Sequence, residues 1–264
     1  MLQVEHISKT FNAGTINERV ALDDITLTLE EGDFVTVIGG NGAGKSTMLN
    51  AIAGVWPVDE GRILIDGKDV TALPEYKRAA FLGRVFQDPM TGTAANMGID
   101  ENLAMAARRG QRRGLRWGIT AAEREEYVGL LKNLDLGLET RLTSKVGLLS
   151  GGQRQAVTLL MATLKKPKLL LLDEHTAALD PKTAAKVLDT TEKIVQRDKL
   201  TTLMITHNMR DAIAHGNRLI MLYDGRIVVD IAGEEKKKLT VEQLLALFSK
   251  ASGSDEADDK LLLS

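Results

Sequence analysis

The sequence predicts an α/β fold with a parallel sheet at its core, an antiparallel β layer and an inserted, mostly helical subdomain. Three observations lead to this prediction. Short apolar runs alternate with helical patterns after residue 150, alternating apolar and polar runs fill the first third, and strand signals are scarce between residues 90 and 150. The 264 residues, 44% of them hydrophobic, are enough for one large domain.

The antiparallel layer is predicted from the first third of the chain. Apolar and polar residues alternate there in three runs, which is the pattern of strands with one buried face, namely "LQVEHISKTF" (2–11), "VALDDITLTL" (20–29) and "GRILIDGKDV" (61–70).

The core strands are predicted from short apolar segments that end in glycine or polar residues. These segments are 33–40, 167–174, 200–207 and 217–230, and the four consecutive leucines at 169–172 indicate a strand buried on both faces. Helical patterns lie between them at 45–53, 153–164, 181–197 and 208–215, with Asp180 and Pro181 suited to begin the third helix. Strands that alternate with helices predict a parallel sheet.

The remaining segments complete the predicted organisation of one domain, residues 1–264. Residues 236–250 can form one helix capped near Thr240, and the acidic stretch after it is expected to be a solvated tail. We therefore expect residues 1–89 and 161–232 to build the β layer and core, 90–160 the helical subdomain, and 233–264 the C-terminal helix and tail.

Composition excludes several classes of function. The absence of cysteine excludes disulfides, thiolate catalysis and cysteine-bound metals. A net charge of −2 gives no reason to expect nucleic-acid binding, and no apolar run reaches the ~18 residues needed to span a bilayer. Any membrane role is therefore expected to require a partner.

A glycine-rich loop, "GGNGAGKST" (39–47), carries the first chemical signal. It matches G-x-x-x-x-G-K-[ST] between an apolar strand and a helix, so its backbone N–H groups can wrap phosphates while Lys45 adds charge and the Ser46 hydroxyl binds Mg²⁺. The loop predicts a P-loop NTPase core of the RecA-like type that binds a nucleoside triphosphate. The expected nucleotide contacts are Gly39, Asn41, Gly42, Ala43, Gly44, Lys45, Ser46 and Thr47.

A carboxylate pair at the end of "LLLLDE" (169–174) supplies the second half of such a site. Asp173 can hold Mg²⁺ through water, and Glu174 can act as the general base. Loop and carboxylates together also occur in GTPases and small-molecule kinases. The sequence lacks an Asn-Lys-x-Asp guanine reader, and the arginine run at 108–116 could be either a kinase lid or, as we favour, a solvated surface.

A second glycine turn, "LLSGGQRQ" (148–155), separates these possibilities. Ser150 stands where a helix cap belongs, and the helix start that follows can attract an anion. The turn has no lysine and no preceding strand, so it can only touch a phosphate that is held by something else.

With these motifs in this order, the sequence resembles the ATP-binding subunits of ABC transporters over nearly its whole length. The loop at 39–47 resembles Walker A, "LSGGQ" (149–153) the family signature, and "LLLLDE" Walker B. "ALD" (178–180) resembles the D-loop, His207 the switch histidine, Gln87 the Q-loop glutamine, and Phe11 the aromatic residue that stacks on adenine.

The resemblance implies a head-to-tail dimer around two ATP molecules. Ser150, Gly151, Gly152 and Gln153 of one copy would contact the phosphates held by Lys45 of the other. His207 and Gln87 would assist Lys45 and Glu174 in hydrolysis, with Mg²⁺ held by Ser46, Gln87 and Asp173. The chain departs from the commonest family pattern at His175, where many relatives have proline, and at Phe11, where tyrosine is more usual; we expect His175 to be structural.

The resemblance also implies partners. A separate integral-membrane permease would hold the subunit at the cytoplasmic face of the cell membrane. The uptake systems it resembles combine a branched-chain-type permease with a solute-binding lipoprotein and carry amino acids or similar small solutes. The alternative is a soluble ABC-type ATPase of iron-sulfur assembly or DNA repair.

Overall fold

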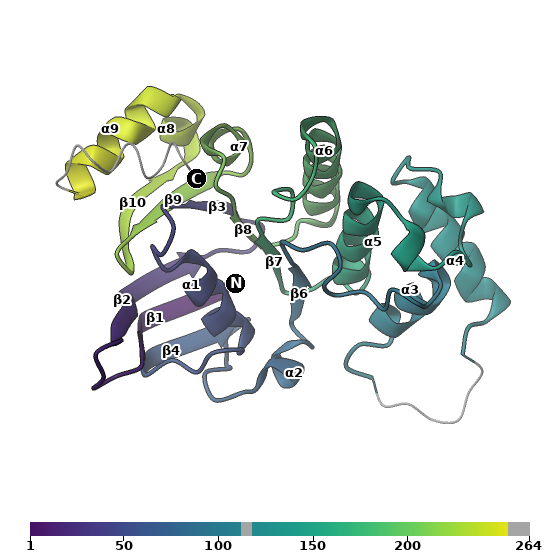
Figure 1. Ribbon diagram of the computed structural model, residues 1–264, viewed down its shortest axis with the longest axis horizontal. Coiled ribbons are helices and arrows are strands. Elements are labelled where there is room, and N and C mark those ends of the chain that lie inside the picture. Colours follow the sequence, from purple (N-terminus) through teal and green to yellow (C-terminus); the bar gives the residue numbers. More distant parts are fainter. Residues whose placement is uncertain (112–117, 253–264) are drawn as a thin grey trace.

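The computed structural model describes residues 1–111 and 118–252, which form two sheets and a helical region (Figure 1). The smaller sheet is antiparallel, with the strand order β2-β1-β4-β5. Its strands are β1 (Leu2–Phe11), β2 (Arg19–Leu29), β4 (Glu60–Ile65) and β5 (Lys68–Asp69). The antiparallel layer predicted from the first third of the chain is thereby confirmed.

The larger sheet has the order β10-β9-β3-β8-β7-β6, and the five strands from β9 to β6 are parallel. Its strands are β3 (Phe34–Ile38), β6 (Leu82–Val85), β7 (Leu169–Asp173), β8 (Thr202–Ile205), β9 (Arg218–Tyr223) and β10 (Arg226–Ala232). The predicted segment 217–230 forms two antiparallel strands, because Asp224 and Gly225 both adopt positive φ and reverse the chain.

Helices cover both faces of this sheet, which explains the four consecutive leucines of β7. Leu169 and Leu171 belong to the core that β7 shares with the antiparallel sheet and α1 (Lys45–Ala53). Leu170 and Leu172 face the opposite core, which contains α6 (Pro181–Asp198) and the helical region. Successive side chains of a strand point to opposite faces, so a strand between two cores is apolar throughout. The smaller helices α2 (Glu75–Arg78) and α7 (Met209–Ala214) flank the sheet.

The helical region lies at the opposite side of the molecule from the antiparallel sheet (Figure 1). It contains α3 (Ile99–Ala107), α4 (Ala121–Lys132), α5 (Gly151–Thr163) and the 3-10 turns η1 (Leu138–Thr140) and η2 (Val146–Leu148). Between residues 90 and 150, the described part of the chain contributes no strand to either sheet. The prediction of a mostly helical insertion is therefore confirmed.

The C-terminal region differs from the single helix that 236–250 suggested. The chain forms α8 (Gly233–Lys237) and then α9 (Val241–Ser252). Thr240 caps the second helix as predicted, because its Oγ1 accepts a hydrogen bond from the Gln243 backbone at 3.2 Å and Gln243 Oε1 accepts one from the Thr240 backbone at 3.0 Å. The predicted acidic tail and residues 112–116 of the arginine run lie outside the described residues.

Within the ranges that the structure describes, no helix combines the length and the apolar character needed to cross a membrane.

Candidate functional site

The glycine-rich loop joins the end of β3 to the start of α1. Gly39, Gly42 and Gly44 have φ values of 149°, 82° and 102°, in the region that favours glycine. A Cβ on Gly39 would lie 2.3 Å from the Leu222 carbonyl oxygen, and one on Gly44 would lie 2.5 Å from the Ala21 carbonyl oxygen. The loop therefore needs glycine both for its conformation and for its close approach to neighbouring strands.

Lys45, the first residue of α1, is folded back over this loop. Its side chain is buried, and Nζ donates hydrogen bonds to the carbonyl oxygens of Gly39 at 2.6 Å and Gly40 at 3.2 Å. Burial lowers the pKa of Lys45, while the nearby carboxylates of Glu174 and Asp173 oppose that shift. The loop thus holds a cation whose partners are weak carbonyl acceptors, which a phosphate can replace.

A cavity of about 190 Å³ opens above the loop. It brings together most of the predicted nucleotide contacts with one predicted catalytic carboxylate. Its lining residues are Phe11, Arg19, Ala21, Asn41, Gly42, Ala43, Gly44, Lys45, Ser46, Thr47 and Glu174.

The two carboxylates stand at the carboxyl end of β7, beside the loop. Burial raises the pKa of Asp173, and the positive charges of Arg84 and Lys45 oppose that shift. Glu174 has a φ of 44°, which is unusual for a residue with a side chain. Its Oε2 lies 3.8 Å from Nδ1 of His207, which follows β8. Glu174 therefore lines the cavity and also lies near His207.

The predicted Mg²⁺ ligands are all oxygen donors. They comprise the exposed hydroxyl of Ser46, the carboxylate of Asp173 and the amide of Gln87, which is exposed just after β6. Within residues 1–111 and 118–252, no group of three or more His, Cys, Asp or Glu side chains could hold a metal ion by itself. Hard oxygen donors in small number fit Mg²⁺, which usually binds one or two carboxylates and completes its shell with phosphate and water.

The second glycine turn begins α5, as predicted. Ser150 Oγ accepts a hydrogen bond from the Gln153 backbone at 3.3 Å, and Gln153 Oε1 accepts one from the Ser150 backbone at 3.2 Å. Ser150 and Gly151 are exposed. None of the four residues from Ser150 to Gln153 lines the cavity above Lys45. Within one chain, the two loops therefore do not form one site.

Gly152 has a packing role that the sequence did not reveal. It is buried, and a Cβ at this position would lie 2.0 Å from Cγ2 of Thr183 on α6. The glycine therefore lets α5 and α6 approach each other.

Two further side chains belong to the site although no sequence motif identifies them. Arg19, at the start of β2, lines the cavity and donates from Nη2 to the Gly42 carbonyl oxygen at 2.9 Å. Trp56 packs edge-on against Phe11, with ring centroids 5.6 Å apart. Both are far in sequence from the residues they contact, so local patterns could not identify them.

His175 is buried and directly follows the carboxylates of Asp173 and Glu174. Burial, together with the charge of His215, lowers the pKa of His175 to about 4, so its ring is neutral near pH 7. Its Nε2 lies 3.1 Å from Thr191 Oγ1, and that hydroxyl donates to the Val187 carbonyl oxygen at 2.8 Å. Nε2 is therefore the protonated nitrogen, and the burial supports the structural role expected for this residue.

The chain is similar in sequence to members of one known protein family. The family described as ABC transporter matches residues 22–177. A tyrosine transport ATP-binding protein of Clostridioides difficile is 44% identical over 251 residues, covering 95% of this chain and 100% of that protein. A spermidine/putrescine import ATP-binding protein of Protochlamydia amoebophila is 34% identical, covering 84% of this chain and 55% of that protein.

A solved structure with the same fold is an ATP-binding cassette in a dimeric, post-hydrolysis state bound to ADP and Pi. It is 30% identical to this chain, with a TM-score of 0.75, and the match covers 88% of this chain and 98% of the cassette.

Proposed function

Because the chain belongs to the ABC transporter family, as an ATP-hydrolysing ATP-binding subunit, we propose that it drives the uptake of an amino acid through a separate membrane permease. Tyrosine is the first candidate solute, since the match to the tyrosine transport protein covers 95% of this chain and 100% of that protein. The relatives reported above are transport proteins by name, and nothing supports the alternative of a soluble assembly or repair ATPase.

One observation carries the proposed mechanism: the exposed turn at Ser150 and the cavity above Lys45 belong to different parts of the chain surface. A helix start without a lysine attracts an anion too weakly to hold a triphosphate alone. Two copies arranged head to tail place each turn against the nucleotide of the other copy. ATP then joins the two surfaces, and hydrolysis releases them.

The residues of the site divide into groups by their chemistry. Phe11 stacks on the adenine, and the loop from Gly39 to Thr47 wraps the phosphates. Ser150 to Gln153 of the second copy close the site from the other side.

Hydrolysis depends on the metal-binding and catalytic side chains. Ser46, Gln87 and Asp173 would hold Mg²⁺, which would neutralise charge on the phosphates. Glu174 accepts the proton of the attacking water. His207, whose Nδ1 lies 3.8 Å from Glu174 Oε2, positions Glu174.

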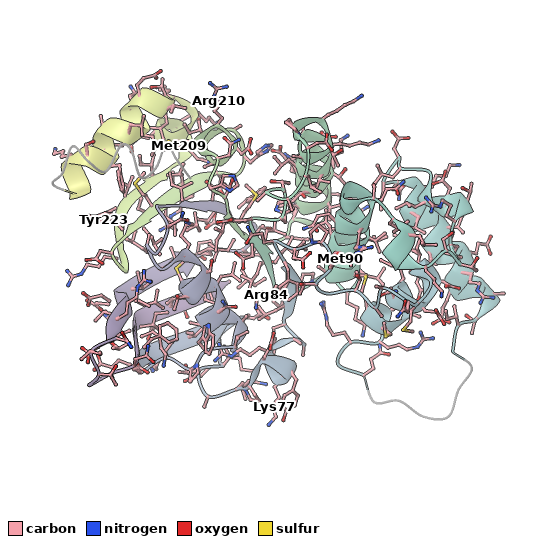
Figure 2. The ribbon with its side chains drawn as sticks, viewed as in Figure 1. Lys77, Arg84, Met90, Met209, Arg210 and Tyr223 are labelled. Atoms are coloured by element: carbon pink, nitrogen blue, oxygen red, sulfur yellow. The ribbon has the colours of Figure 1, made fainter. Side chains whose placement is uncertain are left out.

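Attachment to the permease is assigned to the surface that follows β6. Met90, which is 56% exposed, lies there three residues after Gln87 (Figure 2), and Met105 of α3 is 37% exposed. Residues 90–160 form the lobe that carries this surface. The permease holds the subunit at the cytoplasmic face of the membrane, and a solute-binding lipoprotein delivers the solute.

Two experiments test the proposed transport function. An integral-membrane protein is expected to co-purify with this subunit, and deletion of the subunit is expected to abolish uptake of labelled tyrosine.

The dimer is tested by Ser150→Arg, which places a bulky charged group at the exposed turn. The variant is expected to bind ATP with unchanged affinity, because Ser150 lies outside its own cavity, and to lose ATP-induced dimerisation and nearly all ATPase activity. Equilibrium ATP binding and light scattering in the presence of ATP measure the two effects. Normal dimerisation and hydrolysis by this variant would refute the assignment.

A further inference from the structure

Arg84, on β6, is a nearly buried cation beside Asp173 (Figure 2). Its side chain is 13% exposed. Nη2 donates a hydrogen bond to Asn50 Oδ1 on α1 at 2.6 Å and lies 3.6 Å from Asp173 Oδ2. The guanidinium therefore bridges the helix of the phosphate loop and the carboxylate expected to bind Mg²⁺.

A third contact holds Arg84 from the side of the helical region. Its guanidinium carbon lies 4.5 Å from the centroid of the Phe86 ring. The Phe86 carbonyl oxygen accepts a hydrogen bond from Nε2 of Gln155 at 2.9 Å, and Gln155 is fully buried on α5. A continuous series of contacts thus runs from the signature helix to Asp173.

From these contacts we infer that Arg84 is a positioning residue for Asp173: it fixes the orientation in which this carboxylate binds the magnesium of the nucleotide. This inference rests on the proposed function, because it requires an ATP site with Mg²⁺.

The geometry favours positioning over general stabilisation of the fold. Arg84 Nε is buried without a hydrogen-bond partner among the described residues. A buried cation with an unsatisfied N–H is unfavourable for stability compared with an apolar side chain of similar size. Asn50 and Phe86 hold the guanidinium independently of Asp173, so it offers the carboxylate a fixed partner. Partners of metal-binding carboxylates typically improve metal affinity by orienting the ligand.

The test is Arg84→Met, which keeps the length and apolar bulk of the side chain and removes the guanidinium. Affinity for the non-hydrolysable analogue AMP-PNP is measured by calorimetry, once with excess Mg²⁺ and once with EDTA. The ratio of the two affinities reports how strongly the metal is held at the nucleotide. We expect Arg84→Met to reduce this ratio by about tenfold and to leave the affinity in EDTA unchanged.

Two further variants make the result specific. Arg84→Lys keeps the charge but loses the planar guanidinium group. Its ratio of AMP-PNP affinities is therefore expected to fall between those of the wild type and Arg84→Met. Arg62→Met is the matched control, since Arg62 is an exposed arginine of the antiparallel sheet that pairs with Glu5. Its ratio is expected to equal that of the wild type. Thermal unfolding verifies that each variant is folded.

The outcomes are distinguishable. An unchanged or increased ratio in Arg84→Met overturns the inference, because Arg84 would then act as a bystander or as a charge that opposes the metal. If Arg84→Met does not fold, a wild-type ratio in Arg84→Lys overturns it. Failure of the wild-type chain to bind AMP-PNP would instead refute the proposed function.

Discussion

At the scale of single residues, the site contains charges that belong to no motif. Lys45 is the cation that the loop pattern predicts, and Arg19 and Arg84 add two more from β2 and β6. Arg19 is exposed and faces the cavity, whereas Arg84 is nearly buried behind Asp173. A bound triphosphate is therefore expected to interact with Arg19 directly and with Arg84 only through the metal carboxylate.

Arg19→Gln tests the direct interaction. Removing a cation from the edge of a cavity that binds a polyanion is expected to weaken ATP binding about fivefold, or by about 1 kcal/mol, which is the size of a solvent-screened charge pair. The affinity of the variant is also expected to fall less steeply with added salt. Equilibrium titration with ATP at two salt concentrations measures both effects.

Arg62→Gln is the control for Arg19, because it removes an equal charge from a surface away from the cavity. Equal ATP affinity in Arg19→Gln and Arg62→Gln would show that Arg19 serves only the loop conformation, through its bond to Gly42.

At the scale of elements, α5 connects three parts of the molecule. Its first turn presents Ser150 and Gly151 to solvent, Gly152 packs against α6, and Gln155 bonds to the segment after β6. The two glycines of the signature thus have different structural roles. Gly151 is the exposed member of the pair, and Gly152 lets α5 and α6 approach each other.

Gly152→Ala tests whether Gly152 is required for the packing of α5 against α6. Its added methyl group would overlap Cγ2 of Thr183, so the free energy of unfolding is expected to fall by about 1–3 kcal/mol. Thr183→Ser removes that Cγ2 and is expected to restore most of the loss when combined with Gly152→Ala. Urea unfolding of the two single variants and the double variant measures the coupling. Simple additivity of the two single effects would contradict the contact.

At the scale of the whole molecule, the antiparallel sheet and the helical region lie at opposite sides of the core sheet (Figure 1). The cavity above Lys45 is built by the loop and the antiparallel sheet, and the Ser150 turn belongs to the helical region. In the proposed mechanism these are two incomplete half-sites, and head-to-tail pairing of two copies would complete both.

Mixing two inactive variants tests this pairing. Lys45→Ala damages the loop and keeps the turn, and Ser150→Arg does the reverse, so each is expected to be nearly inactive alone. An equal mixture is expected to recover up to about one quarter of the wild-type ATPase rate, since random encounters pair the two variants half of the time and each such pair has one complete site of two. Steady-state ATPase assays at constant total protein measure the recovery.

The control for this experiment is a mixture of Lys45→Ala with the double variant Lys45→Ala/Ser150→Arg, in which no complete site can form. Activity in the control, or none in the first mixture, would contradict sites shared between copies.

The amino-acid sequence by itself determined the elements of this protein and the chemistry of its loops. The apolar run of β7, the glycine-rich loop before α1 and the cap at Ser150 are local, because a strand, a tight turn and a helix start depend on residues that are neighbours in the chain. These patterns did not predict the break between α8 and α9 or the division of 217–230 into two strands. Thr240 stands at the first of these positions, and the Asp224-Gly225 turn stands at the second.

The tertiary structure alone decided which distant residues meet. The contacts of Arg84 with Asn50 and Asp173, of Arg19 with Gly42, and of Gly152 with Thr183 each join separate elements. Periodicity and turn chemistry carry no information about such pairs, because these contacts depend on how the sheets and helices pack. The same packing separates the Ser150 turn from the cavity above Lys45, and for this reason the proposed mechanism requires a second copy of the chain.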